Sequence, residues 1–245
     1  MGGSGRSTRS DLSRVKGAVR AEGSQASESG DSVHGVAAAS LGAKKKSLHA
    51  SERDSERVQK ERAHYKERLT ELILERVKFL DESGINLAMT RLFGRARPGV
   101  RIAEGVPRNR GENITLLAVL GLSGLQAELT VNGAVDGEVF KLYVKQVLCP
   151  SLNEGDVVVM DNLKAHTVAG ITEAIESRGA RVLYLPPYSP DLNPIEKCWS
   201  KIKTALRKAK ARTREELEAA LKEVLKSITE SDAQAWFTCC GYAVH

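Results

Sequence analysis

Residues 156–161 read DVVVMD, four apolar residues between two acids, and they decide the fold. Three of the four apolar residues are β-branched valines, and no glycine or proline interrupts the run. A continuous apolar run of this length is typical of a strand that is covered on both faces of a parallel sheet. We therefore expect a central strand here, with Asp161 at its carboxyl end.

On both sides of this strand, short apolar runs alternate with amphipathic segments. The other predicted strands are residues 77–81, 88–103, 113–122 and 181–185. The predicted helices are residues 136–147 and 168–178, one that begins at Pro194 and one that Thr213 and Glu216 cap. Strands that first form a meander and then alternate with helices indicate an α/β fold, with a mixed sheet flanked by helices.

The N-terminal part of the chain has a different composition. Residues 1–43 contain 17 Gly or Ser and no Phe, Trp or Tyr, so they cannot bury enough apolar surface to fold alone. We expect this low-complexity segment to be mostly disordered, with residues 33–41 as its one candidate for a short helix. Residues 44–75 are predicted as a basic linker helix, helical from about residue 51 to residue 75, and either solvated or in contact with DNA. Residues 76–245 form the predicted α/β domain.

Charge and cysteine content narrow the class of protein. The chain carries 37 Lys or Arg against 31 Asp or Glu, and this excess suits a polyanionic partner such as nucleic acid. Its four cysteines form no paired CxxC pattern, which argues against a zinc site or a disulfide framework. The first 30 residues lack an apolar stretch, and the longest apolar run, residues 114–125, is too short to cross a bilayer. We expect an intracellular protein without a membrane segment.

Three acids fall at the ends of predicted elements. Asp81 and Asp161 end strands, and Glu196 lies in the first turn of the helix that begins at Pro194. Open sites in α/β sheets form at the carboxyl ends of strands, where converging carboxylates bind hard cations through oxygen. A pair of Mg²⁺ ions about 4 Å apart is a common device for displacement at phosphorus.

Each acid also has a purely structural interpretation. Asp81 and Asp161 could simply end strands as turn-forming residues. Glu196 could complete a capping box, with Asn193 as the N-cap and Pro194 at the first helical position. The spacing alone leaves these alternatives open.

Two longer motifs resemble those of a known family. They are DNLKAH at residues 161–166 and LPPYSPDLNPIE at residues 185–196, with 34 residues between Asp161 and Glu196. Together they resemble bacterial insertion-sequence transposases related to mariner elements, which are DDE superfamily endonucleases. FLDESG at residues 79–84 is similar to the family's first-acid motif, and residues 44–50 and 240–242 are also similar. The resemblance covers residues 44–245.

This resemblance implies a fold, a cofactor and a reaction. It implies a ribonuclease-H-like catalytic domain with Mg²⁺ or Mn²⁺ held by Asp81, Asp161 and Glu196, where Asp81 bridges both ions. The reaction would be hydrolysis of a phosphodiester in DNA, followed by attack of the freed 3′-hydroxyl on target DNA. His166 could orient water or a phosphate, or be only a polar residue at a helix start. Asp191 and Asn193 are expected to shape the loop.

The helix behind Glu196 is strongly basic. Residues 197–214 contain eight Lys or Arg and no acid. We predict DNA contacts for Lys197, Lys201, Lys203, Arg207, Lys208 and Lys210, with solvated surface charge as the alternative. A second basic edge is predicted at Arg91, Arg95, Arg97 and Arg108. The expected partner is double-stranded DNA, both element ends and target, and the resemblance suggests a homodimer on two DNA ends.

The N-terminal segment departs from the family. Full-length relatives carry helix-turn-helix modules there, whereas residues 1–43 are too rich in Gly and Ser to form two such modules. The leading hypothesis is therefore a DNA transposase, located in the cytoplasm and associated with the nucleoid. The alternatives are a truncated, non-catalytic DNA-binding remnant and another ribonuclease-H-like nuclease such as a resolvase. The proline-rich motif argues against the last.

Overall fold

The computed structural model of the protein describes residues 48–244. The disorder predicted for residues 1–43 and the short helix predicted at residues 33–41 lie outside the described residues. The described residues all belong to one compact unit. Between residues 48 and 244, no helix combines the length and the apolar character that crossing a bilayer requires.

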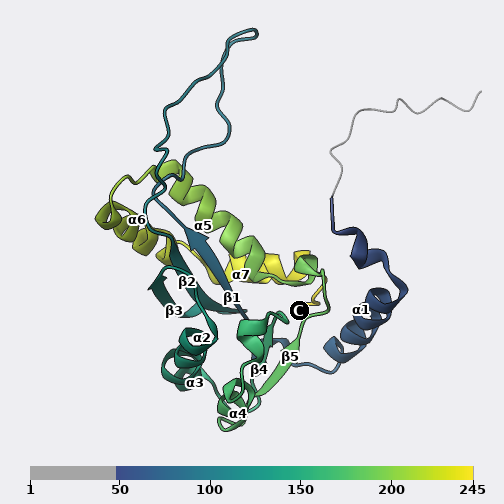
Figure 1. Ribbon diagram of the computed structural model, residues 1–245. Coiled ribbons are helices and arrows are strands. Elements are labelled where there is room, and N and C mark those ends of the chain that lie inside the picture. Colours follow the sequence, from purple (N-terminus) through teal and green to yellow (C-terminus); the bar gives the residue numbers. More distant parts are fainter. Residues whose placement is uncertain (1–47, 245) are drawn as a thin grey trace, which may run out of the picture. The chain divides into compact units, whose positions relative to one another are not determined.

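A five-stranded mixed sheet forms the centre of this unit (Figure 1). Its strands are β1 (Val77–Ile85), β2 (Ile114–Gly121), β3 (Gly124–Asn132), β4 (Val157–Met160) and β5 (Arg181–Tyr184). The strand order is β3-β2-β1-β4-β5, antiparallel on the β2–β3 side and parallel on the β4–β5 side. The predicted mixed sheet is confirmed. β4 is an interior strand between β1 and β5, and β1 occupies the middle.

The register of β1 explains where the first two acids meet. β1 pairs in parallel with β4 from Val77 opposite Val157 to Phe79 opposite Val159. Extending this register by two residues places Asp81 level with Asp161. The prediction that Asp81 ends its strand is wrong, because β2 supplies an antiparallel partner that carries β1 on to Ile85. Asp81 lies instead where the parallel pairing stops.

The prediction of a strand at residues 88–103 is also wrong. These residues belong to the long connection between β1 and β2, where no strand is formed. Every residue from 91 to 103 is exposed, Leu92 by 73% and Phe93 by 90%, so this stretch has no buried face to hold it in a sheet. On its other side, β2 pairs antiparallel with β3. From Ala127 to Asn132, the residues of β3 alternate between half-buried and exposed positions. The sharp turn before it uses Gly124 at φ 111°.

Helices cover both faces of the sheet (Figure 1). The long helices α5 (Ile195–Ala209), α6 (Arg214–Lys226) and α7 (Glu230–Cys239) pack on one face, around Phe79, Trp199 and Phe237. The short helices α2 (Gly137–Tyr143), α3 (Cys149–Ser151) and α4 (Ile171–Glu176), with a π turn at Val144–Leu148, pack on the other face. Successive residues of β1 serve opposite cores, as strand geometry requires.

The N-terminal helix is shorter than predicted. The single helix expected at residues 51–75 is a 3₁₀ turn at Ser51–Asp54, helix α1 at Glu56–Leu69 and a second 3₁₀ turn at Leu74–Arg76. Further 3₁₀ turns occur at Lys164–Thr167 and Pro190–Leu192. The capping box of Thr213 and Glu216 is confirmed. Sequence reasoning missed α7, although Thr229 and Asp232 repeat the same capping box.

Candidate active site

The structure brings Asp81, Asp161 and Glu196 to one cavity of about 520 Å³. Asp81 comes from the middle strand, Asp161 from the residue after β4, and Glu196 from the first turn of α5. The proline-rich loop, residues 186–194, forms much of the wall through residues 186–190 and Asn193. Among the residues that the structure describes, no three His, Cys, Asp or Glu side chains already form a set that could hold a metal ion. The three acids therefore share a cavity without forming a finished metal centre.

Protein groups hold both oxygens of the Asp81 carboxylate. Oδ1 accepts a hydrogen bond from the Glu82 amide at 2.8 Å, and Oδ2 accepts one from Trp199 Nε1 at 3.2 Å. Asn193 Nδ2 also donates to Oδ2, at 3.4 Å. Burial, followed by the negative charge of Glu196, raises the pKa of Asp81 to about 7. Burial and a neighbouring negative charge both disfavour the ionised form of a carboxyl group.

Asp161 is held by a buried histidine. His166 Nδ1 lies 2.6 Å from Asp161 Oδ1, and His166 Nε2 lies 2.9 Å from Glu82 Oε2. The imidazole is 1% exposed and stacks on Phe140 with ring centroids 4.2 Å apart. Burial alone would lower the pKa of His166, but the two carboxylates outweigh it and raise that pKa to about 10. His166 is thus a charged bridge between two acids, a role that neither interpretation from the sequence contained.

Glu196 does not cap its helix. In α5, Pro194 occupies the N-cap position, and no side chain makes a capping hydrogen bond there. The Asn193 amide, the expected cap, turns to Asp81 instead. The capping-box interpretation of Glu196 is therefore wrong. Partial burial, with a contribution from Asp161, raises the pKa of Glu196 against the opposing effects of Lys203 and Lys197.

The donor atoms of this cavity fit a hard divalent cation. The three acids supply only oxygen ligands, which Mg²⁺ and Mn²⁺ prefer. The wall also contains an unsatisfied acceptor, because Asn193 Oδ1 is buried without a hydrogen-bond partner among the described residues. A buried acceptor of this kind normally has a partner such as water or an ion.

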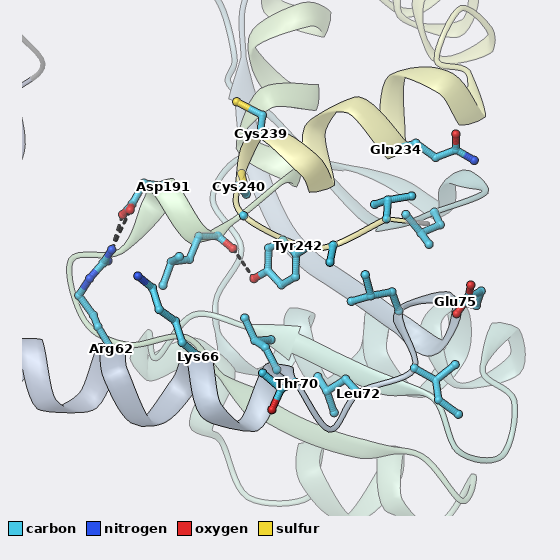
Figure 2. Close-up of a pocket in the computed structure, with 18 of the residues that line it drawn as sticks. Arg62, Lys66, Thr70, Leu72, Glu75, Asp191, Gln234, Cys239, Cys240 and Tyr242 are labelled. Atoms are coloured by element: carbon cyan, nitrogen blue, oxygen red, sulfur yellow. Dashed lines mark hydrogen bonds and ion pairs between the residues drawn. The ribbon is translucent and has the colours of Figure 1, made fainter.

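Arg62 of α1 and Tyr242 bind the proline-rich loop and together form a clamp on it (Figure 2). Arg62 of α1 donates to Asp191 Oδ1 at 3.1 Å, to Asp191 Oδ2 at 2.8 Å and to Ser189 Oγ at 2.6 Å. Although burial opposes it, the Arg62 guanidinium holds the pKa of Asp191 below its usual value. Tyr242 donates to the Leu192 carbonyl at 2.7 Å. Asp191 thus shapes the loop, as the sequence predicted.

The clamp borders the cavity drawn in Figure 2, of about 940 Å³, which lies between α1, the loop and the C-terminal residues. None of the three acids lines it. The sequence offered no local signal for Arg62 or Tyr242, because each contacts a segment that is distant along the chain.

The predicted DNA-binding residues of α5 lie on two sides of the helix. Lys203 lies seven residues, about two helical turns, after Glu196 and so on the same face of α5, and Arg207 follows four residues later on that face. Lys197, Lys201 and Lys208 line a separate groove with Arg91 and Trp236. Two of the six predicted DNA-binding residues already form ion pairs with acids. Lys201 pairs with Asp232, and Lys210, the residue after α5, pairs with Glu104.

A mixed five-stranded sheet with acids on its middle strand, after β4 and on the next long helix defines a ribonuclease-H-like nuclease fold. The chain belongs to the DDE superfamily endonucleases, whose family model matches residues 76–218. The resemblance predicted from the motifs is thereby confirmed for the family. No curated protein sequence matches the chain.

The fold is similar to that of solved structures of Mos1 mariner transposase. The pre-cleavage Mos1 transpososome is 16% identical, with a TM-score of 0.64 over 85% of this chain and 69% of that chain. The Mos1 paired-end complex with Mg is 18% identical, with a TM-score of 0.62 over 82% of this chain and 65% of that chain. The Mos1 catalytic domain is 15% identical, with a TM-score of 0.55 over 78% of this chain and 97% of that domain. The predicted ribonuclease-H-like fold is confirmed.

Proposed function

We propose that this chain is a DDE-type transposase that hydrolyses a phosphodiester bond of DNA and joins the freed 3′ end to target DNA. The observation that carries the proposal is the convergence of Asp81, Asp161 and Glu196 on one cavity. Membership of the DDE superfamily endonucleases supports it. So does the likeness of the fold to Mos1 transposase in transpososome and strand-transfer complexes.

Asp81, Asp161 and Glu196 are the proposed ligands of Mg²⁺ or Mn²⁺. Asp81 is the candidate for the shared ligand, because it lies on β1, the middle strand of the sheet, and lines the cavity with the other two acids. When bound, the cations would activate the attacking oxygen and neutralise charge at the leaving oxygen. Trp199 and Asn193 would orient Asp81 through their hydrogen bonds. Mos1 structures with Mg and with Mn are consistent with either ion.

Duplex DNA is the proposed partner. Lys203 and Arg207 are placed to contact the phosphates of a strand that enters the active-site cavity. Arg57 of α1 lines the same cavity, which favours the DNA-contacting interpretation of the basic linker helix. A homodimer that pairs two DNA ends, and association with the nucleoid, complete the proposal. Mos1 transposase forms a paired-end complex with a transposon end.

A nicking assay on supercoiled DNA tests this proposal. With Mn²⁺, the wild-type protein should convert the supercoiled form to the open circle, and Asp161→Asn should not. Asp54→Asn is a matched control, because Asp54 is 66% exposed and pairs with His49 away from the site. Equal nicking by the wild type and Asp161→Asn would contradict the proposed site. A wild type that binds DNA and never nicks it would favour the non-catalytic remnant.

A further inference from the structure

His166 joins acids from two strands of the sheet. Asp161 follows β4, and Glu82 is the residue directly after Asp81 on β1. The chain after Asp161 folds into a short turn, in which the His166 amide donates to the Leu163 carbonyl at 2.9 Å. This turn brings the imidazole back to the residue that ends the strand. A buried side chain that contacts one acid of the site and the neighbour of another is placed to set their geometry.

We propose that His166 is a positioning residue that pins one oxygen of Asp161 and leaves the other for a divalent cation. The inference rests on the proposed function, in which Asp161 is a metal ligand. It assigns a role to His166 and Glu82 that goes beyond the three acids.

The polar contacts of Asp161 support this division between its two carboxylate oxygens. Oδ1 forms an ion pair with His166 Nδ1 at 2.6 Å and accepts a hydrogen bond from the Leu163 amide at 3.2 Å, and the Asp161 carbonyl oxygen lies 3.4 Å from the same Nδ1. Among the described residues, Oδ2 has no hydrogen-bond or ion-pair partner. The side chain remains 39% exposed and lines the cavity with Asp81 and Glu196. Oδ1 therefore carries the protein contacts that fix this carboxylate, while Oδ2 is the less encumbered oxygen for a ligand.

The imidazole itself is held rigidly. Glu82 binds Nε2 at the edge opposite Asp161, and Phe140 covers one face of the ring. A ring held at both nitrogens cannot rotate without breaking an ion pair in a buried environment. Groups of this kind orient metal ligands, and their removal typically lowers metal affinity or activity about 10- to 100-fold.

Two isosteric variants separate the functions of the two nitrogens. In His166→Asn, the amide nitrogen replaces Nδ1 and still donates to Asp161. In His166→Gln, it replaces Nε2 and reaches Glu82 but not Asp161. The affinity for Mn²⁺ is measured by EPR titration of the DNA-free protein, with circular dichroism to confirm folding. His64→Ala is a matched control, because that histidine is 71% exposed on α1.

We expect His166→Ala and His166→Gln to bind Mn²⁺ about 10- to 100-fold more weakly than the wild type. His166→Asn and His64→Ala should stay close to the wild type, and Asp161→Asn should bind more weakly. Wild-type affinity in folded His166→Ala, or equal losses in the Asn and Gln variants, would overturn the positioning role alone. A wild type that binds no Mn²⁺, or an Asp161→Asn variant as tight as the wild type, would overturn the proposed metal site and this inference with it.

Discussion

Replacing Arg62 by Ala should loosen α1 from the proline-rich loop. The Arg62 side chain is 7% exposed and makes two charge-assisted hydrogen bonds to Asp191 and one to Ser189. Two such bonds contribute about 3–6 kcal/mol in total. Because Asp191 is 40% exposed and can be rehydrated, we discount this to about 2–3 kcal/mol. We therefore expect α1 to undock locally while the sheet stays folded.

Hydrogen exchange of the α1 amides measures this undocking directly. A loss of about 2–3 kcal/mol corresponds to exchange that is about 30- to 150-fold faster in Arg62→Ala. Arg53→Ala is the matched control, because Arg53 makes one 3.1 Å contact with the same acid from a 26% exposed position, and it should cost less than about 1 kcal/mol. Equal exchange in the wild type and Arg62→Ala would refute the clamp. Equal acceleration in both variants would show that burial of the guanidinium adds nothing.

Three further predictions concern the site and its frame. Glu196→Gln should abolish Mn²⁺-dependent nicking. It should change the free energy of urea unfolding by less than about 0.5 kcal/mol, because Glu196 makes no capping hydrogen bond. A large loss of stability would contradict this. Lys203→Ala should reduce the salt dependence of DNA binding by about one counterion. Lys210→Ala should not, because the Lys210 side chain pairs with Glu104. Equal slopes of log affinity against log salt in the two variants would count against the assigned DNA contacts. Asp191→Asn should lower thermal stability wherever the wild-type carboxylate is ionised, neutral pH included. The pKa of folded Asp191 lies below its ordinary value of 3.8, so its stabilisation is present above that pH and is lost as the pH falls through the folded value, where wild type and variant should converge.

The strands that carry the site could be predicted because their signals are local. β4 is a continuous apolar run and β2 is nearly so, since both are buried on both faces, and the first half of β1 holds Val77, Phe79 and Leu80. β3 escaped prediction because it is an edge strand with one solvated face, so its sequence lacks the continuous apolar run of the interior strands. The apolar residues scattered through residues 88–103 led to the wrong prediction of a strand. The structure leaves Leu92 and Phe93 among them exposed.

The three acids could be found from motifs, but the residues that hold them could not. Glu82 and His166 are 84 residues apart, and Arg62 and Asp191 are 129 apart. No spacing rule in the sequence links such pairs, because their residues meet only in the folded chain. The Glu196 alternative failed for a related reason. A cap is a local interaction, and the tertiary contact of Asn193 with Asp81 replaces it.

The proline-rich loop shows why its support must come from remote residues. Four of its positions, Pro186, Pro187, Pro190 and Pro194, lack a backbone N–H, so the loop cannot continue the β-sheet ladder beyond β5. Tyr188 adopts a left-handed conformation at φ 53°, which costs a non-glycine residue about 1–2 kcal/mol. Such strain persists only where surrounding contacts over-determine the backbone. Here those contacts come from α1, the C-terminal residues and the middle strand, and together they fix where α5 begins and so bring Glu196 to the cavity of the other two acids.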